Sequence, residues 1–464
     1  MDRFKKTQKE TFSAKESGKT VLWQIKKVLL CHFPDLQARL NKIPDKRKGI
    51  EYSIAELVMA AIVLFLFKCE SRNEFNLRLK DEQFRRNYYR LFHLCPPSMD
   101  AVNNFFKILD PDAFEELHCR LVNALIEKRV LHKLRFFAKF FCIAIDGSGI
   151  YNWGATPPES IRQYALKKET KKDTDSSKVN YSTQVLEAVL VCSNGMVIPL
   201  LSEWIANDGE KYDKQDSELK AFKRLAIRLK KYFPRLSICI LSDGLYTNVA
   251  MMDVCRQYGW NYITVFKDGN LPSVWEEVNS LLPLGGGAQT CQLEPFDRTC
   301  RIKQTYRWIK DIPYQKYSIH WLECVQNTVH RKTGEISMHR FVFLSNFEMD
   351  RHNVKFILMA GRARWSIEDH FNTQKNRGGV LHHKFNRNDF KAIKNWHKVR
   401  QLACMINELV EYTQELRLLL KENAKMTLKE LWKSLNAFLI MCTVNDLSIE
   451  FESWSKGSRQ VRLE

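Results

Sequence analysis

Two features that mark other protein classes are missing from this chain of 464 residues: a long hydrophobic run and closely spaced cysteines. The longest apolar run, residues 57–67, is about half of the roughly 20 residues that a membrane-spanning helix needs. The apolar stretch 21–30 is interrupted by Lys26 and Lys27, which makes it a poor secretory signal. The thirteen cysteines form no Cys-x-x-Cys pair. We therefore expect no structural zinc ribbon, no membrane partner and a reducing, cytoplasmic compartment.

Acidic residues are also in short supply. The chain has 73 Lys and Arg against 53 Asp and Glu, a formal net charge of +20. Such an excess suits a polyanionic partner, and nucleic acid is the natural one because a membrane partner is disfavoured. The hydrophobic fraction of 45% and the aromatic fraction of 12% indicate a globular protein, and the length indicates two to four domains.

The first third of the chain is helical in pattern. After a polar lead-in over residues 1–20, apolar residues recur at three- and four-residue spacing in segments 54–68, 99–109 and 112–129. Basic clusters at 46–48 and 85–86 lie in the same part. We interpret residues 1–135 as an N-terminal helical domain that binds DNA, although a solvated charged surface would give the same clusters.

From residue 136 the pattern changes to strands. Asn194-Gly195 separates two strand-like runs and predicts a hairpin. The order is strand, hairpin strand, strand, helix, strand, helix, strand, which predicts an α/β fold, a mixed sheet with helices on its faces. The predicted segments are, in order, 136–145, 185–192, 196–204, 216–232, 236–241, 247–258 and 261–266. Residues 276–348 read as a β-rich insertion into this domain (136–275 and 349–400), and residues 401–464 as a C-terminal helical region.

The segment 364–375 places three charged residues on one side of a helix. Arg364, Glu368 and Lys375 are four and seven residues apart, which keeps them on one face. Ile367 and Phe371 can anchor the helix against a core. A carboxylate between two cations on a partly buried helix is costly unless it has a partner or a function.

Two aspartates far upstream can join Glu368. Asp146 and Asp243 each follow an apolar strand and precede a glycine. Each Asp-Gly pair alone is typical of a simple turn. Carboxylates at the ends of neighbouring strands converge on one rim of a sheet, however, where α/β proteins bind ligands. Three clustered carboxylates repel one another unless a cation neutralises them, and oxygen ligands favour Mg²⁺ or Mn²⁺, two ions in the case of phosphodiester chemistry.

At this point the sequence resembles a known family. Arg364-x3-Glu368-x6-Lys375 is similar to the Tyr-x2-Arg-x3-Glu-x6-Lys signature of bacterial insertion-sequence DDE transposases of the cut-and-paste group. The chain departs from the signature at Gly361, where the family has tyrosine. The resemblance implies a ribonuclease H-like catalytic domain, with a mixed five-stranded sheet, flanking helices and a β-rich insertion before the last acid. It covers roughly residues 136–400.

The resemblance also implies roles for individual residues. Asp146, Asp243 and Glu368 would be catalytic and would hold two Mg²⁺ ions, with Mn²⁺ as a substitute. Arg364 and Lys375 would contact DNA phosphates, and ion pairing with Glu368 is the alternative for each. Asp369 is the rival third acid if the register differs.

Further DNA contacts are expected around the motif and in the insertion. Trp308 or Trp321 would stack on a flipped base, the alternative being a small core; Trp365 is expected to support the core. A basic patch follows the motif, and a lysine run lies in a polar loop between strands. The basic residues are Arg377, His383 and Lys384 in the patch and Lys167, Lys168, Lys171 and Lys172 in the run.

The sequence therefore predicts a DNA transposase that cleaves transposon ends and joins the 3′-hydroxyls to target DNA. Its partners would be double-stranded DNA and, on DNA, a second copy of the chain. It would be a cytoplasmic, nucleoid-associated bacterial protein. A metal-dependent nuclease or resolvase that never joins strands, and a catalytically silent domesticated DNA-binding protein, are the alternatives.

Overall fold

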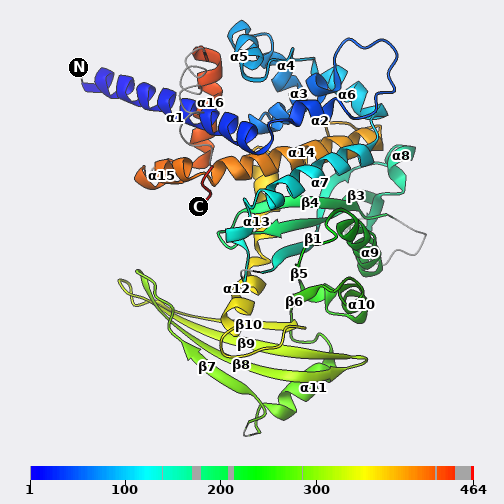
Figure 1. Ribbon diagram of the computed structural model, residues 1–464, viewed down its shortest axis with the longest axis vertical. Coiled ribbons are helices and arrows are strands. Elements are labelled where there is room, and N and C mark those ends of the chain that lie inside the picture. The colour runs from blue at the N-terminus through cyan, green and yellow to red at the C-terminus, as the bar shows by residue number, and fades with distance from the viewer. Residues whose placement is uncertain are drawn as a thin grey trace, which may run out of the picture.

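The computed structural model describes residues 2–137, 139–169, 179–206, 214–284, 286–423, 426–444 and 461–464, without the side chains of residues 2–14, 167–169, 179 and 214–217. The predicted lysine run therefore lies outside the described side chains. Figure 1 shows three parts from top to bottom: a layer of helices, a central sheet with helices on its faces, and a long β-extension.

The helical layer combines both ends of the chain (Figure 1). Its N-terminal helices are α1 (Asp2–His32), α2 (Leu36–Leu40), α3 (Ile54–Leu66), α4 (Arg72–Arg78), α5 (Glu82–Phe92), α6 (Met99–Ile108) and α7 (Pro111–Glu127). Its C-terminal helices are α14 (Phe390–Glu411), α15 (Gln414–Glu422) and α16 (Leu428–Met441). α3 begins with a capping box between Ser53 and Glu56, and every residue of α3 except Glu56 is buried. It is the centre of this layer because α14, α6 and α2 pack around it.

Three expectations about these ends need correction. Residues 1–20 are not a separate lead-in, because α1 starts at Asp2 and packs along α16. The expected boundary between residues 400 and 401 falls inside α14, which runs from Phe390 to Glu411. The N-terminal and C-terminal helical regions consequently form one layer rather than two domains, since α14 and α16 supply surfaces that the N-terminal helices cover.

The central part is a mixed sheet, as the order of segments predicts. Its strands are β1 (Phe141–Trp153), β2 (Ala165–Glu169), β3 (Val179–Val191), β4 (Val197–Trp204), β5 (Ile238–Ser242) and β6 (Asn261–Val265). β1 pairs antiparallel with β3 and parallel with β5, and β5 pairs parallel with β6. β4 and β2 share the outer edge of β3. The predicted hairpin turn is confirmed: Gly195 has φ +89°, a conformation that glycine adopts freely.

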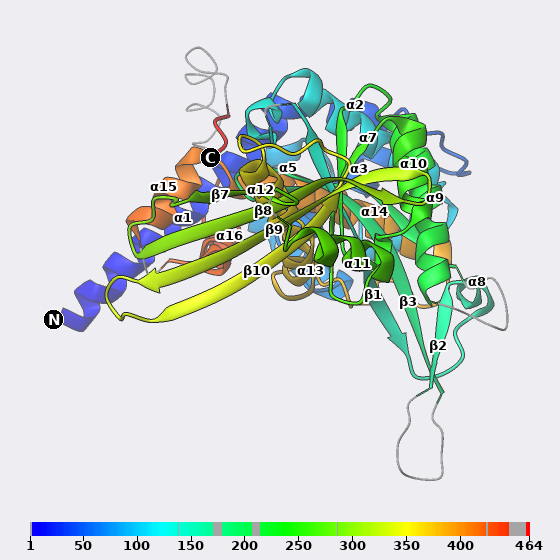
Figure 2. The same ribbon diagram turned by 90° about the horizontal axis from the view of Figure 1, so that it is seen from below.

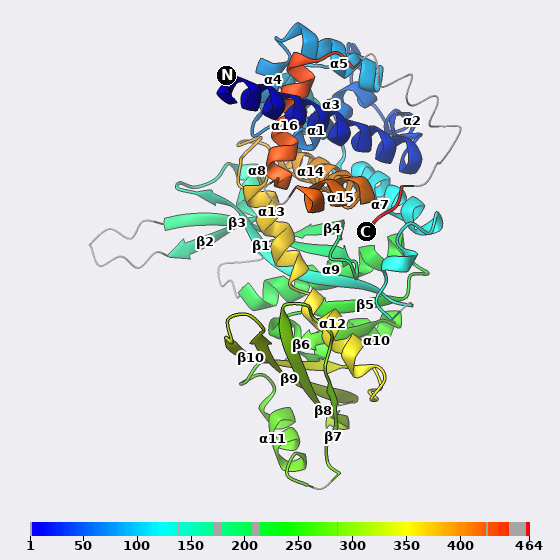
Figure 3. The ribbon, with the colours of Figure 1, turned by 90° about the vertical axis from the view of Figure 1, so that its left-hand side faces the viewer.

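Helices cover both faces of this sheet. Alternate residues of β1 contribute to different cores: Ile143 and Ile145 pack with α9 (Lys214–Tyr232) and α10 (Val249–Tyr258), and Cys142 and Ala144 pack with the opposite layer. The opposite layer consists of α12 (Val354–Ala363) and α13 (Ser366–Asn376), which run down the sheet in Figure 3. The short elements η1 (His132–Leu134), α8 (Glu159–Arg162) and η2 (Gly244–Tyr246) connect strands and helices.

The β-rich insertion continues the central sheet. It comprises α11 (Pro272–Leu281), β7 (Gln289–Leu293), β8 (Cys300–Tyr314), β9 (Tyr317–His330) and β10 (Ile336–Ser345). β10 pairs with β6, so the described strands form one ten-stranded sheet in which β4 pairs β3 beside the path β2-β3-β1-β5-β6-β10-β9-β8-β7. The tips of β8–β10 project from the molecule (Figure 2). The insertion is thus not a domain with a sheet of its own, and the sheet exceeds the five expected strands.

In the part of the chain that the structure describes, no helix combines the length and the apolar character that crossing a membrane would require.

Candidate active site

Asp146 and Asp243 lie at the same level on neighbouring strands. The parallel pairing of β1 with β5 ends at Ala144 opposite Leu241, and two further residues along each strand bring Asp146 opposite Asp243. Because side chains alternate between faces, both aspartates leave the sheet on the face of Ala144 and Leu241, which packs against α12 and α13. The sheet therefore brings together two acids that are far apart in sequence.

The local setting of the two aspartates differs from the expectation. β1 does not end at Asp146 but runs on to Trp153, so Asp146 is a mid-strand residue whose β5 neighbour has already ended. Its Oδ1 accepts a hydrogen bond from the Gly147 amide at 2.9 Å. Asp243 does follow its strand, and its Oδ1 accepts from the Leu245 amide at 2.9 Å to cap η2. The turn role that the sequence left open is real for Asp243 and coexists with its place beside Asp146.

The third acid reaches this rim from α13. Ile367 and Phe371 are buried against the sheet, as predicted, and anchor the helix. Arg364 connects the acids: its Nη2 lies 2.7 Å from Glu368 Oε1, and its Nη1 lies 3.8 Å from Asp146 Oδ2. Asp369 is exposed on another side of the helix. Glu368 is therefore the acid that α13 presents to the aspartates.

Arg364 is not a helix-surface cation in this arrangement. Its side chain is 5% exposed, against 41% for Glu368, and its Nε has no hydrogen-bond partner among the described residues. The helix breaks here, since α12 ends at Ala363, α13 begins at Ser366, and the Ile367 amide bonds the Arg364 carbonyl three residues back. The ion pair with Glu368, which the sequence left as the alternative, is the contact that the structure contains.

The negative charge at this rim is only partly compensated. Burial and, to a smaller extent, the charges of Asp243 and Glu368 raise the pKa of Asp146, while Arg364 and the Gly147 amide oppose the rise; the pKa that results is about 6. Asp243 has one cation nearby: Lys267 Nζ lies 3.8 Å from Asp243 Oδ2, and the lysine side chain is exposed. The rim therefore favours uptake of a further positive charge, either a proton or a metal ion.

The chemistry of the donors fits Mg²⁺ or Mn²⁺. Asp146, Asp243 and Glu368 offer only carboxylate oxygens, the ligands that hard divalent ions prefer. With the present side-chain arrangement, no group of three or more His, Cys, Asp or Glu among the described residues is close enough to hold an ion. The guanidinium of Arg364 bridges two of the three acids, so these acids would bind an ion only after Arg364 or Glu368 changed rotamer.

Gly361, where the family signature has tyrosine, has a steric explanation. It lies buried in α12, and a Cβ built there would approach the Phe343 ring to 2.5 Å. Phe343 belongs to β10, the strand that joins the extension to the sheet. A tyrosine at position 361 would displace this phenylalanine. Glycine at this position lets α12 pack closely against β10, which the tyrosine of the resembled signature would not allow.

The aromatic candidates need two corrections. Trp308 and Trp321, proposed as base-stacking residues, are 3% and 0% exposed, so neither offers a free ring face. Trp321 packs edge-on against Trp275. Trp365, expected in the core, is instead 56% exposed, with the Arg364 guanidinium over its ring at 4.6 Å. The accessible indole is the one next to the acids.

The basic candidates are partly engaged with the protein itself. Lys375 is half-buried, with its ammonium 5.8 Å from the Phe371 ring centre. Lys384 donates to the Asn152 carbonyl at 2.5 Å and lies over the Trp153 ring, which ties it to the far half of β1. Arg377 and His383 are exposed. The patch after the motif is thus adjacent to the strand that carries Asp146.

Sequence reasoning missed a buried polar cluster beside the acids. Glu187 stands directly opposite Asp146 in the β1–β3 ladder and is 1% exposed. His370 and His397, from α13 and α14, face its carboxylate. The available signal was a single glutamate inside the apolar run 185–192, where a charge requires a partner.

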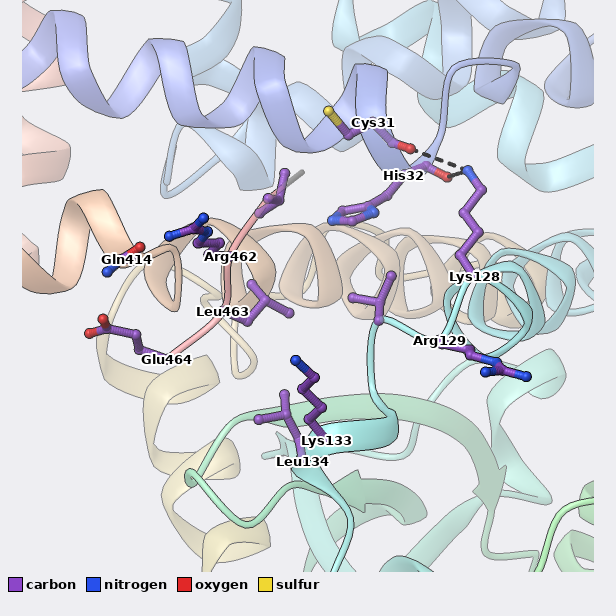
Figure 4. A pocket seen from close by; sticks show the side chains of 12 residues that line it. Cys31, His32, Lys128, Arg129, Lys133, Leu134, Gln414, Arg462, Leu463 and Glu464 are labelled. Carbon is purple, nitrogen blue, oxygen red and sulfur yellow. Dashed lines mark hydrogen bonds between the residues drawn. The ribbon is translucent and has the colours of Figure 1, made fainter. Parts of the chain in front are cut away.

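A hollow of about 730 Å³ lies away from these residues. It opens between the ends of α1 and α7 and the last residues of the chain, and its wall contains Lys128, Arg129, Lys133 and Arg462 (Figure 4). Lys128 Nζ donates to the carbonyl oxygens of Cys31 and His32 at 3.2 and 3.1 Å. None of the predicted site residues lines this hollow.

Comparison with models of known protein families finds no match, and comparison with curated proteins finds none either. Function is consequently argued from the geometry of the site.

Proposed function

We propose that this chain is a DNA transposase that cleaves transposon ends and joins the 3′-hydroxyls to target DNA, using divalent metal ions held by Asp146, Asp243 and Glu368. One observation carries the proposal: Asp146 and Asp243 lie at one level of adjacent parallel strands, and Glu368 approaches them from the covering helix. The positive charge beside these three acids does not balance their negative charge, and the pKa of Asp146 is raised.

The strand arrangement supports a ribonuclease H-like catalytic domain as part of this proposal. β1, β3 and β4 form an antiparallel meander, and β5 and β6 add to β1 in parallel after α9 and α10. These five strands of the ten-stranded sheet are consistent with the mixed five-stranded sheet that the resemblance implies. The extension enters between β6 and α12, before the last acid, which is also the place that the resemblance implies.

The chain's own residues account for binding and orientation. Asp146, Asp243 and Glu368 would hold the ions, which in two-metal sites activate the attacking oxygen and stabilise the leaving one. Arg364 pairs with both Asp146 and Glu368 and offsets part of their charge. Once released from these acids, its guanidinium can bind a phosphate of the substrate in two-pronged fashion.

Two further features favour a polynucleotide substrate. The net charge of +20 lowers the free energy of a polyanion near the surface. The exposed Trp365 ring beside the acids and the exposed Arg377 and His383 can contact bases and phosphates, respectively. A homodimer on DNA is part of the proposal, because joining two ends requires two active sites.

The test is cleavage of the chain's own flanking DNA. Purified full-length protein is incubated with Mg²⁺ and a plasmid that carries the coding sequence with its native flanks, together with a target plasmid. Excision at inverted repeats followed by joining to the target supports a transposase. Cleavage without joining supports the nuclease alternative, and salt-sensitive binding without cleavage supports the catalytically silent protein. The Glu368→Gln variant is the control for contaminating nuclease.

A further inference from the structure

One cation reaches the acids from the solvent side of the rim. Lys267 follows β6, the parallel neighbour of β5, and its Nζ lies 3.8 Å from Asp243 Oδ2. Its side chain is 62% exposed, whereas the side chain of Arg364 is 5% exposed. In the described part of the chain, no other lysine or arginine lies within ion-pair distance of Asp146, Asp243 or Glu368. Lys267 is therefore the cation at this rim that a substrate in solvent can contact.

The backbone at Lys267 is tied to the extension. Its carbonyl accepts hydrogen bonds from Trp275 Nε1 of α11 at 3.2 Å and from the Asn270 amide at 3.1 Å. The amide of the preceding residue, Phe266, donates to the Val342 carbonyl of β10 at 2.9 Å. The Phe266 ring also stacks on Trp275, with the ring centres 4.6 Å apart. The lysine side chain thus extends from a backbone that β10 and α11 hold in place.

Gly244, the residue after Asp243, leaves room for this side chain. A Cβ built at Gly244 would lie 2.5 Å from Asn270 Nδ2 and 3.5 Å from Lys267 Cδ. Asn270 Nδ2 donates to the Gly244 carbonyl at 2.8 Å, so the loop after β6 is joined directly to the turn after Asp243. The absence of a Cβ at Gly244 permits this close approach, and the lysine stem lies across the turn that Asp243 caps.

The ammonium of Lys267 has hydrogen-bonding capacity to spare. A separation of 3.8 Å from Asp243 is longer than a hydrogen bond, and Nζ makes no hydrogen bond within the described residues. An ion pair on an exposed side chain contributes little to stability, so little free energy opposes its replacement by another contact. A phosphate oxygen would accept a charge-assisted hydrogen bond from this ammonium. The geometry therefore suits an anion on the solvent side of Asp243.

We infer that Lys267 is a phosphate-binding residue at the reaction centre, where its ammonium holds the backbone of the DNA substrate beside the three acids. The inference rests on the proposed function, which supplies DNA as the substrate and the acids as ligands of divalent ions. Removal of the ammonium then has two effects of opposite sign. DNA loses one phosphate contact, whereas a divalent ion at Asp243 loses a neighbouring positive charge that repels it. Removal of a lysine that only held Asp243 in place would instead weaken ion binding.

The first test measures DNA binding in the absence of divalent ions. The probe is a fluorescent duplex with the sequence that flanks the coding region, and the variants are Lys267→Met and Lys316→Met in the full-length chain. Lys316 is a matched control, because its side chain is 57% exposed and pairs with Asp253. Lys267→Met should reduce the slope of log binding constant against log salt by about 0.9, and Lys316→Met should leave the slope unchanged. An unchanged slope in Lys267→Met, or an equal reduction in both variants, overturns the inference.

The second test measures Mn²⁺ binding without DNA, by electron paramagnetic resonance. Lys267→Met should bind Mn²⁺ about fivefold more tightly than the wild-type protein does, because it lacks the positive charge beside Asp243. Lys316→Met should bind Mn²⁺ as the wild type does. Weaker binding in Lys267→Met would show that the lysine positions Asp243, and unchanged binding would place the ammonium away from the ion. Either result overturns the assigned role.

The Lys267→Arg variant separates charge from shape. Arginine keeps the positive charge and can bind a phosphate, so this variant should retain the wild-type salt slope. A slope that falls as far as in Lys267→Met would contradict a role based on charge. Wild-type protein that binds neither the duplex nor Mn²⁺ would overturn the proposed function together with this inference. If the wild type binds both and Lys267→Met changes neither, the inference alone is overturned.

Discussion

The buried carboxylate of Glu115 and the half-buried carboxylate of Asp146 have opposite electrostatic settings. Glu115 of α7 lies 2.6 Å from Arg228 of α9 and 2.5 Å from Lys398 of α14. Burial raises the pKa of Glu115, but the charges of Lys398 and Arg228 outweigh burial and hold it below its ordinary value. Asp146 shares one buried arginine with Glu368, and burial dominates, so its pKa rises to about 6.

The difference in charge balance distinguishes a carboxylate with a structural role from one that can still bind a cation. The Glu115 cluster joins three helices, and Glu203 of β4 supplies a second carboxylate by pairing with Arg228, so both cations have a partner within the protein. The Asp146 cluster joins a strand to one helix, and its single arginine does not balance the negative charge of its acids. Ion pairs that complete themselves need no further partner, whereas the Asp146 cluster gains from any added cation.

The largest expected effect is the loss of DNA cleavage when one of the three clustered acids is replaced. Asp146→Asn, Asp243→Asn and Glu368→Gln should each lower DNA cleavage at least about 10³-fold, because each removes an oxygen ligand of the ions. End binding, measured by electrophoretic mobility shift, should change by less than about threefold. A variant that cleaves near the wild-type rate removes that residue from the catalytic set.

The next effect concerns stability at the compensated cluster. Glu115→Gln should lower the free energy of unfolding by about 3 kcal/mol, because it leaves Arg228 and Lys398 buried without their carboxylate. Urea denaturation measures this change. The double variant Glu115→Gln/Lys398→Met should regain part of the loss, and neither variant should alter the Mg²⁺ dependence of cleavage. A changed Mg²⁺ dependence would contradict the separation of the two clusters.

An effect on stability of similar size and opposite sign is expected from Asp146→Asn in metal-free buffer. The folded pKa of Asp146, about 6, exceeds the ordinary value of 3.8, so the folded state binds the proton more tightly than the unfolded state does. The wild-type protein therefore loses stability as the pH rises from about 4 to about 6. Asp146→Asn removes this loss and should be more stable by up to about 3 kcal/mol at pH 8, with no difference below pH 4. Equal stabilities at pH 8 would show that Arg364 compensates Asp146 fully.

The smallest effect concerns Lys375. Its removal in Lys375→Ala should reduce the slope of log binding constant against log salt by about 0.9, the value for one lost phosphate contact. Lys355 is a matched control, since its ammonium also lies near a phenylalanine ring on the neighbouring helix, 4.8 Å from Phe356. An unchanged slope in Lys375→Ala would leave the lysine as a packing residue of α13.

The sequence predicted the central elements closely, because local periodicity and turn chemistry decide them. The hairpin at Asn194-Gly195 and the segments that became α9, α10 and β6 are confirmed within a few residues. The joining of β10 to β6 was not predictable, since strand pairing across the insertion depends on a register that no local pattern encodes.

The candidate site was likewise predictable only in part from the sequence. Strand-end aspartates and the spacing from Arg364 to Lys375 indicated which acids to consider, but not that Arg364 bridges Asp146 and Glu368. The exposure of Trp365 and the burial of Trp308 and Trp321 depend on how the helices and strands pack, whereas the resemblance suggested base stacking for Trp308 or Trp321 and left a small core as the alternative. Glu187 escaped notice because its partners come from α13 and α14, about 180 to 210 residues later in the chain.

The continuity of the sheet gives the extension a mechanical property. β10 is at once the strand that joins the extension to β6 and, through Phe343, the surface on which Gly361 of α12 rests. The extension is therefore anchored at the strand that supports α12, the helix that precedes the Glu368-bearing helix α13. A force applied at the free tips of β8–β10 is transmitted along hydrogen-bonded strands to α12, and from there to Arg364 and Glu368.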